Sequence, residues 1–365
     1  MASIQSVLTA GEPERRFRDL DLDVKKFVAK STVTLFAIMI AVALLLPLAF
    51  MVTTALKSDD QITSGTILPS SPTTVVVTEG EFAGSEYELF VVPLPDGSSQ
   101  ELALVQPGRE DSVFIDPSAP TVPIEWEGRW RTLDPVTALD PTFGNFGDAW
   151  EALDFLQVLF NTGVIAGVGM AGTVIASTLV AYGLSRFYIP GKKVIMGSLV
   201  ATIILPPFVT LVPTYALWLR VGLVGTWWPL IVPHFFGNAY NVFLLRQFFL
   251  SIPRDLDEAA AIDGASPFRT LITVILPQAK GAVLAVSLFH FFFAWNDFIN
   301  PVIYLAGRSD LQPISVALFD FFGIFSQAVP LVQAGSMLSM AVPILVFLSL
   351  QRIFLGGIDL SGSVK

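Results

Sequence analysis

The sequence predicts an all-α polytopic membrane protein, and three observations support that prediction. Of the 365 residues, 53% are apolar and only 14% are charged, whereas an ordinary soluble domain carries about 25% charged residues. Six long windows are almost free of charge, and a helix of about 20 apolar residues crosses the hydrocarbon core of a bilayer. Lysine and arginine gather at alternate ends of these windows, as the positive-inside rule requires of membrane spans.

The six windows that are almost free of charge define the predicted spans. The six predicted spans are 31–56, 155–185, 194–219, 221–245, 281–305 and 321–351. Five of these windows hold no Asp, Glu, Lys or Arg, and the window 281–305 is interrupted only by Asp297. A soluble core helix can imitate one such window, but a chain of this length cannot bury six.

Orientation follows from the basic residues near the span ends. With the N-terminal tail (1–30) and the C-terminal tail (353–365) in the cytoplasm, fifteen of the 21 Lys and Arg are cytoplasmic and six are outside. Such a bias predicts that both termini are cytoplasmic. The segment 57–154, between the first and second spans, is then extracytoplasmic, and the region 155–352 carries the remaining five spans.

The extracytoplasmic segment is acidic and predicted to be rich in β-strands. Residues 57–157 contain eighteen Asp and Glu against four Lys and Arg. Three short β-prone runs, 74–77, 87–92 and 101–105, are separated by glycine and proline turns, which is typical of a small antiparallel sheet. Arg129, Trp130 and Arg131 are either a solvated rim or contacts for a ligand.

Several kinds of chemistry are not supported by the sequence. The chain has no Cys and only His234 and His290, which are too few for a three-ligand zinc site. Gly191-Lys192 lacks the first glycine and the hydroxyl residue of a phosphate-binding loop. We therefore expect a non-catalytic membrane subunit that neither binds a metal nor hydrolyses ATP.

The turn between the fourth and fifth spans is the most informative stretch. Pro253 suits a first helical position, the acidic residues 255, 257 and 258 complement the positive end of the helix dipole, and Gly264 suits the residue that ends the helix. Ser266 is then the cap and Pro267 the start of the next helix. The pattern predicts a short alanine-rich helix over about 253–264, whose small side chains allow another protein to approach closely.

The same stretch carries a resemblance to a known family. Glu258-Ala259-Ala260, Gly264, Val274 and Leu276-Pro277 have the spacing of the E-A-A-x3-G-x9-I-x-L-P signature. This signature resembles that of permease subunits of binding-protein-dependent ABC importers, and the fuller string is similar to the carbohydrate branch of the maltose and glycerol-phosphate type. The tail is similar to that of the shorter of two paired permeases. Two departures are Lys280-Gly281, where the family has a further proline, and the region from about 73 to 139, which typical members lack.

The resemblance implies a type I ABC importer permease fold and a set of partners. These are a second permease subunit, two ATPase subunits, an extracytoplasmic solute-binding protein, a sugar substrate and membrane lipid, with no nucleic acid. Glu258, Ala259, Ala260, Asp263 and Gly264 would then couple the chain to an ATPase, and Leu276 and Pro277 would form an elbow. ATP and Mg would be held by the ATPase rather than by this chain. The implied location is the plasma (inner) membrane of a prokaryote, crossed several times.

Polar and aromatic groups within the spans are candidates for the substrate pathway. They are Trp295, Asn296, Asp297, Asn238 and Asn241. Asn296 and Asp297 are equally suited to capping or bridging helices, and His290 is expected to be a packed, hydrogen-bonded residue. Glycines at 163, 167, 169 and 172 allow close helix contact, either within the chain or with the partner permease.

Two other functions are compatible with the composition. One is a membrane-anchored receptor or scaffold that presents the acidic segment, and the other is a proton-coupled sugar transporter. The signature at 258–277 favours the ABC permease. The sequence leaves open which sugar or polyol is carried, what the region 73–139 does, and which permease is the partner.

Overall fold

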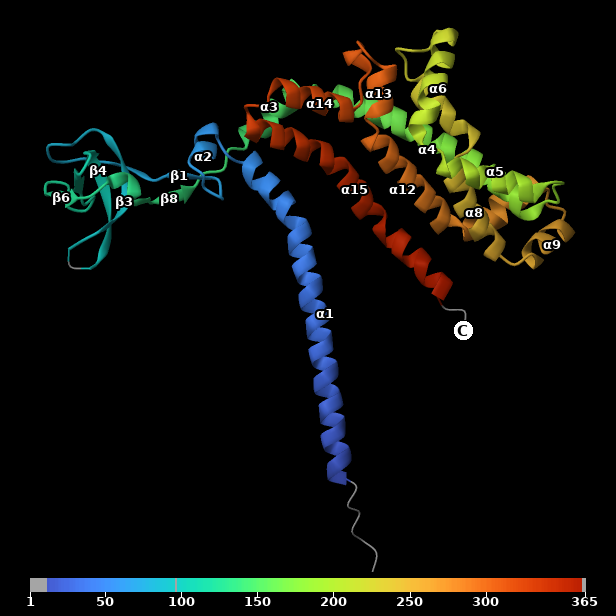
Figure 1. Cartoon of the computed structure of the whole chain (residues 1–365), viewed down its shortest axis with the longest axis horizontal. Coiled ribbons are helices and arrows are strands. Elements are labelled where there is room, and N and C mark those ends of the chain that lie inside the picture. Colours follow the sequence, from blue (N-terminus) through green and yellow to red (C-terminus); the bar gives the residue numbers. More distant parts are fainter. Residues whose placement is uncertain (1–11, 96, 363–365) are drawn as a thin grey trace, which may run out of the picture. The chain divides into compact units, whose positions relative to one another are not determined.

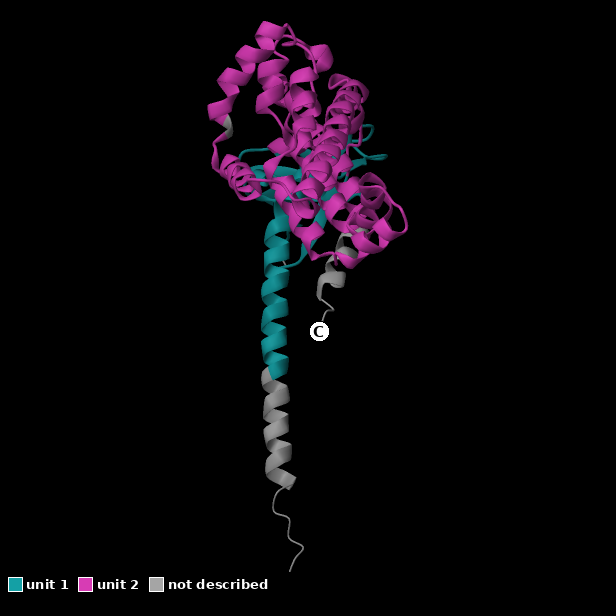
Figure 2. Cartoon of the chain, turned by 90° about the vertical axis from the view of Figure 1, so that its right-hand side faces the viewer, with its two compact units in different colours: residues 1–54, 64–139 teal, residues 55–63, 140–365 magenta. Residues whose placement is uncertain are grey.

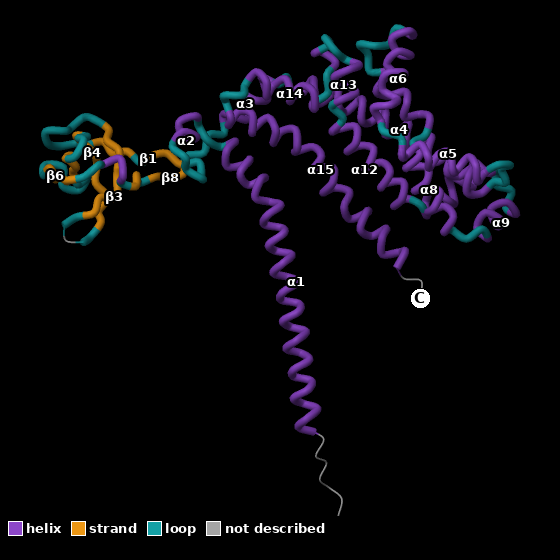
Figure 3. The backbone as a smooth tube through the Cα atoms, in the orientation of Figure 1, coloured by secondary structure: helices purple, strands orange, loops and turns teal. Residues whose placement is uncertain are grey.

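The computed structural model describes residues 12–95 and 97–362 and forms two compact units (Figures 1 and 2). Unit 1 contains the residues up to 54 together with 64–139, and unit 2 contains 55–63 together with 140–365. The described strands all lie in unit 1 (Figure 3). Residues 1–11 and 363–365 of the two predicted tails lie outside the described residues.

Helix α1 (Glu12–Ala55) contains the first predicted span. Its section Lys26–Ala55 is long and apolar enough to cross a membrane. The large apolar side chains between 33 and 46 are exposed, and an apolar surface of this extent is a feature of membrane or protein interfaces.

A small antiparallel sheet occupies residues 74–135 of unit 1. Its strands are hydrogen-bonded in the order β2-β3-β4-β5-β6, with β7 paired to β3. The bounds are β2 (Thr74–Val76), β3 (Glu86–Pro93), β4 (Ser99–Gln106), β5 (Asp111–Ile115), β6 (Pro123–Glu127) and β7 (Asp134–Pro135). A 3-10 turn, η1 (Trp130–Thr132), lies between β6 and β7.

Both faces of this sheet are covered by apolar side chains. Phe90, Leu102 and Phe114 belong to one cluster, whereas their chain neighbours Ala103 and Ile115 belong to another. Because successive side chains of a strand point to opposite faces, these two clusters lie on opposite sides of the sheet.

The strand segment begins and ends at one place. Strand β1 (Ser70–Pro72) pairs with β8 (Thr137–Leu139), with Ser70 opposite Leu139. The described strands therefore occupy only the middle of the predicted segment 57–154. Its ends, 57–63 and 140–154, form the helices α2 (Asp59–Thr63) and α3 (Gly144–Ala152) and belong to unit 2.

Unit 2 is built around helix α4 (Phe155–Arg186). The other elements are α5 (Lys192–Ile204), α6 (Pro207–Val221), α7 (Trp228–Ile231), η2 (Val232–Phe236), α8 (Ala239–Ser251), α9 (Asp255–Ile262), α10 (Pro267–Thr270), η3 (Leu271–Ile275), α11 (Leu276–Gln278), α12 (Lys280–Asn296), α13 (Ile299–Tyr304), η4 (Ser309–Leu311), α14 (Ile314–Ile324) and α15 (Val329–Gly362). Element η3 is a π-helix, and η2 and η4 are 3-10 helices.

Two apolar clusters fix opposite ends of α4. Near its start, Phe155 packs in a cluster with Trp295 and Phe321. Near its end, Tyr182 packs in a cluster with Leu245 and Ile275. The α4 helix is thus the axis on which α8, α12 and α14 are assembled.

The structure does not reproduce the predicted count of six spans. Among the described residues, three helices are long and apolar enough to cross a membrane, and the number rises to five if each of two bent pairs is one span. The pair α5 and α6 bends by 99°, and the helices from Pro267 to Asn296 bend by 83° at Ala279. The first bend falls at Pro206-Pro207, where proline cannot continue the helical hydrogen bonds.

Among the predicted spans, the window 221–245 is the one to which the described structure gives neither a long helix nor a bent pair of helices. It is divided into α7, η2 and the start of α8. Pro229 and Pro233 remove backbone donors, and Gly237 has a φ of +80°, which ends the 3-10 helix before α8 begins.

The last span and the C-terminal tail also differ from the prediction. The window 321–351 is broken between Ile324 and Val329, so the span begins with α15 at Val329. Pro330, in the first turn of α15, suits a helix start. Helix α15 continues to Gly362 and includes most of the predicted tail 353–365.

Candidate functional site

The short helix α9 lies in the turn between α8 and α10. It spans Asp255–Ile262 with Arg254 as its N-cap residue. Pro253 therefore precedes the helix and does not occupy the first helical position that the sequence predicts for it. The acidic side chains 255, 257 and 258 lie in the first turn, where they interact favourably with the helix dipole.

The end of α9 has the capping geometry that the sequence predicts. Gly264 has a φ of +77°, its N–H donates to the Ala261 carbonyl at 3.0 Å, and the Ala265 N–H donates to the Ala260 carbonyl at 2.9 Å. This pair of bonds is the Schellman motif, which requires the left-handed residue at Gly264. Ser266 Oγ accepts from the N–H of Arg269 and caps α10, which begins at Pro267 as predicted.

The last turn of α4 holds this short helix through one ion pair and two hydrogen bonds, which together we call the clasp. Arg186 Nε forms an ion pair with Asp257 Oδ2 at 3.1 Å, with only 7% of the arginine side chain exposed. Arg186 Nη2 also donates to the Ile252 carbonyl at 3.0 Å, and Tyr182 Oη donates to the Pro267 carbonyl at 3.1 Å. The end of α4 therefore holds the chain before, within and after α9. Sequence reasoning gave Asp257 a role only at the helix dipole and did not predict its ion pair with Arg186.

The opposite side of α9 faces away from the protein. Glu258, Ala259, Asp263 and Gly264 are exposed, as is Ile262, whose exposed fraction is 86%. Ala260 is only 9% exposed and packs inward. Four of the five predicted coupling residues are thus exposed, and the fifth, Ala260, packs against the rest of the protein.

Next to α9 the structure has a pocket of about 310 Å³. Its lining includes Tyr182, Arg186, Asp257, Glu258 and Ala261. The pocket is therefore bordered both by the clasp and by the exposed surface of the helix, so a side chain from another protein that entered it would touch both.

The predicted elbow lies at a change of helix type. Residues 271–275 form the π-helix η3, and Leu276 and Pro277 form the short α11. The 83° bend follows at Ala279. Leu271 and Ile275 are buried in the cluster that also contains Phe249, so the elbow is packed against α8 on one side.

The five predicted pathway residues form two groups. Trp295 is 5% exposed and packs against Phe291. Asn296 Nδ2 donates to the Phe292 carbonyl at 2.8 Å, and Asp297 accepts from Asn300 Nδ2 at 2.9 Å. Both polar side chains thus make the local hydrogen bonds at helix ends that the sequence offered as the alternative to a pathway role.

The second group is at the start of α8. Asn238 caps the helix by accepting from the N–H of Asn241 at 3.2 Å, and the Asn241 side chain is buried. His290, as expected, is packed and hydrogen-bonded: its Nδ1 lies 3.1 Å from Thr173 Oγ1, and its ring is 4.4 Å from that of His234.

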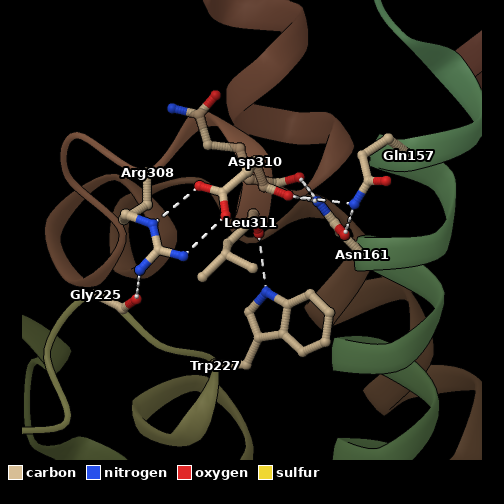
Figure 4. A network of polar contacts seen from close by, with 8 residues as sticks. Gln157, Asn161, Gly225, Trp227, Arg308, Asp310 and Leu311 are labelled. Atoms are coloured by element: carbon tan, nitrogen blue, oxygen red, sulfur yellow. Dashed lines mark hydrogen bonds and ion pairs between the residues drawn. The ribbon is translucent and has the colours of Figure 1, made fainter.

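A second polar network joins two loops to the other end of α4 (Figure 4). Asn161, which is fully buried, donates to the carbonyls of Asp310 and Gln312, and Trp227 Nε1 donates to the Leu311 carbonyl. Arg308 forms an ion pair with Asp310 at 2.8 Å, which lowers the pKa of that carboxyl group. The network ties the loop before α14 to α4 and to the loop before α7.

Known proteins of one family are similar to this chain over most of unit 2. The family described as binding-protein-dependent transport system inner membrane component matches residues 163–359. The osmoprotective compounds uptake permease GgtD of Synechocystis is 32% identical over 241 residues, covering 66% of this chain and 80% of GgtD. The melibiose/raffinose/stachyose import permease MelC of Bacillus subtilis is 32% identical over 246 residues, with 66% and 86% covered.

A solved structure has the same fold. A bacterial ABC transporter involved in import of the acidic polysaccharide alginate aligns with a TM-score of 0.60 and 18% identity, covering 91% of this chain and 97% of its own. This alignment assigns the type I ABC permease fold to the chain. The chain therefore belongs to the binding-protein-dependent transport system inner membrane components, the membrane permeases of ABC importers, and within them resembles the permeases of carbohydrate importers.

Proposed function

We propose that this chain is the permease subunit of an ATP-driven sugar importer, that it forms half of the translocation pathway, and that α9 couples it to an ATPase. The observation that carries the proposal is the geometry of α9. It is clasped on one side by the ion pair between the largely buried Arg186 and the partly exposed Asp257, and it exposes Glu258, Ala259, Ile262 and Gly264 on the other. A helix held in this way can transmit a push to α4 instead of yielding to it.

The assembly proposed around it has five further components. They are a second permease, two ATPase subunits that hold ATP and Mg, an extracytoplasmic solute-binding protein, and the sugar. Closure of the ATPases around ATP moves α9 and its counterpart in the second permease. Packed helices have discrete arrangements, and ATP and the loaded binding protein shift the population between inward-open and outward-open states. Sugars as substrates are supported by relatives named for melibiose and trehalose transport.

We further propose that the chain crosses the membrane six times. One crossing is the interrupted stretch 228–251, whose length can be compared with that of α4 beside it. Leu230 packs beside Ile165, His234 and Phe235 lie against Gly169 and Gly172, and Val242 packs with Ala181. The stretch 228–251 therefore follows α4 in the same direction along its length. If α4 crosses the bilayer, this stretch crosses it too.

The lengths agree with this assignment. Residues 165–181 of α4 rise about 24 Å at 1.5 Å per residue, and only twelve residue steps, from 230 to 242, accompany them. That requires about 2 Å per residue, which is the rise of a 3-10 helix. The η2 element and the break at Gly237 supply such an extended path, so this crossing contains no long helix. Six crossings return both termini to the cytoplasmic side.

The test is reconstitution of the chain with its second permease and ATPase in lipid nanodiscs. We expect ATP hydrolysis to rise when the loaded solute-binding protein is added. A chain that is stable alone and fails to co-purify with an ATPase would instead favour the receptor or scaffold. In proteoliposomes, uptake that is abolished by an uncoupler and indifferent to vanadate would favour a proton-coupled transporter.

A further inference from the structure

The three basic residues of the strand segment converge on one pocket. Residues 64–139 contain twelve Asp and Glu, and their only basic residues are Arg109, Arg129 and Arg131. All three line a pocket of about 500 Å³ in unit 1, together with Gly108, Glu110 and the turn 130–132. Because basic residues are scarce in this segment, their location in one pocket calls for a chemical explanation.

Pairing of two strands brings the arginines together. Strands β5 and β6 are antiparallel, with Asp111 opposite Glu127. The turn before β5 and the turn after β6 are therefore adjacent, and the Gly128 N–H donates to the Glu110 carbonyl at 2.5 Å. Arg109 projects from the first turn and Arg129 from the second.

Each turn is held in a single shape. A Cβ atom at Gly108 would lie 1.7 Å from the Asp111 carbonyl oxygen, and one at Gly128 would lie 2.4 Å from the Trp126 ring. Gly108 also donates to the buried Ser112 Oγ at 3.1 Å. Both turns therefore require glycine, and the backbones beside the arginines are fixed in place.

Trp130 positions the third arginine. Its ring packs edge-on against Phe90, with ring centroids 5.8 Å apart, and the Arg131 guanidinium lies 4.8 Å from the centre of the Trp130 ring. Such cation–π contact orders the side chain without neutralising it. Among the described residues, none of the three arginines forms an ion pair with a carboxylate.

We propose that this arginine pocket binds an acidic saccharide through its carboxylate or phosphate group. Guanidinium groups match such anions with paired hydrogen bonds, and a volume of about 500 Å³ lies within the range of small-molecule sites. The twelve acidic residues of the segment repel a large acidic surface but leave room for a small ligand whose anion reaches the arginines. The choice of a saccharide, rather than another small anion, rests on the proposed transport function.

The test is calorimetric titration of the full chain in nanodiscs of neutral lipid, without an ATPase. The probes are digalacturonate, the neutral disaccharide lactose, and hexaglutamate. We expect saturable binding of digalacturonate, at least tenfold tighter than either other probe, and weaker at high salt because charges are screened.

Variants locate the binding. Arg129→Gln/Arg131→Gln is expected to weaken digalacturonate binding at least tenfold. Arg109→Gln, which leaves the Trp130 contacts intact, covers the case in which the double variant fails to fold. Arg220→Gln removes an exposed charge from unit 2 and is expected to leave binding unchanged.

Three results would overturn the proposal. They are the absence of saturable digalacturonate binding, equal binding of lactose, or tighter binding of hexaglutamate, which would identify the pocket as a dock for an acidic peptide. Since no ATPase takes part, such a failure is distinguishable from failure of ATP coupling, which the nanodisc hydrolysis experiment measures separately.

Discussion

At the scale of single residues, the first four glycines of α4 divide into two kinds. A Cβ at Gly169 would lie 3.0 Å from His290 Nε2 and 3.1 Å from His234 Cδ2, and one at Gly172 would lie 2.6 Å from the Phe235 ring. Gly163 and Gly167 have no such neighbour within 4 Å in the described structure. The two inner glycines allow η2 and α12 to approach α4 closely, whereas the other two leave their side of the helix open.

This difference gives a matched pair of variants. Gly169→Val should overpack the histidine contacts and lower the stability of the isolated chain by about 1–3 kcal/mol. Gly167→Val makes the same chemical change in open space and should have a much smaller effect. The thermal unfolding midpoint in detergent measures both. Equal shifts in the two variants would contradict the packing described for Gly169.

The Arg186–Asp257 pair gives a second prediction. Asp257→Asn leaves the largely buried Arg186 guanidinium without its counter-charge. Because Asp257 itself is partly exposed, we expect the cost to be below the roughly 3–5 kcal/mol of a fully buried pair. We expect a lowered unfolding midpoint and loss of ATPase stimulation. The matched control is Asp310→Asn, because the Arg308–Asp310 pair is exposed and exposed ion pairs contribute little to stability. Similar effects of the two variants would refute the clasp.

Local chemistry is the part of the site that sequence can predict. Gly264, Ser266 and Pro267 have roles set by neighbours a few residues away, and the structure confirms each. Arg186 and Asp257 are 71 positions apart, so only the tertiary fold brings them together. Trp295, which the sequence places among the pathway candidates, is 5% exposed in the structure; an aromatic residue on an apolar helix has the same sequence pattern in a packed core and along a pathway.

At the scale of elements, α9 and its glycine cap are the proposed point of coupling. Glu258→Lys reverses the charge of the exposed surface, and Gly264→Asp places a side chain at a φ of +77°, which is strained for any residue with a Cβ. Both variants should insert into the membrane normally but hydrolyse ATP without sugar uptake. Uptake and hydrolysis are measured in the same proteoliposomes. Normal uptake in both variants would exclude this role for α9.

The broken crossing of residues 228–251 is testable because the chain has no cysteine. Val221 and Ile262 are exposed at the two ends of this stretch. A membrane-impermeant maleimide applied from outside should label Val221→Cys in intact cells, and Ile262→Cys only after permeabilisation. Labelling of both from the same side would mean that the stretch re-enters without crossing.

Proline explains why the element count was harder to predict than the elements' positions. Hydropathy locates apolar windows, and each predicted window contains helix in the structure. Whether a window forms one helix, a bent pair or a 3-10 segment depends on Pro206-Pro207, Pro229 and Pro233, together with the neighbours that satisfy the backbone groups they free. Those neighbours come from elsewhere in the chain.

At the scale of the whole molecule, the strand segment begins and ends in the paired strands β1 and β8. Composition located it, since its acidity contrasts with the apolar spans, but its register could not be inferred because strands paired across long turns have no local marker. Pro72 and Thr137 are opposite each other in the β1–β8 ladder, so a two-residue Asn-Gly turn between them can replace residues 73–136.

We propose that this segment contacts the solute-binding protein or the outer loops of the partner permease. Replacing residues 73–136 with the turn should leave the chain inserted and able to bind its ATPase, but should raise the concentration of loaded binding protein needed for half-maximal uptake. Uptake assays with purified binding protein measure that concentration. Unchanged uptake kinetics would exclude a contact of this segment with the binding protein or the partner permease.

The most direct test of the central claim is crosslinking from α9 to the ATPase. Single cysteines at Ala259 and Ala261, which are exposed, are compared with one at Ala260, which is buried in the same helix, and one at Val221. With a short cysteine-to-lysine crosslinker, Ala259→Cys and Ala261→Cys should join the ATPase in high yield, Ala260→Cys in low yield, and Val221→Cys not at all. Absence of ATPase adducts at both 259 and 261 in an assembled, ATP-hydrolysing complex would contradict the account.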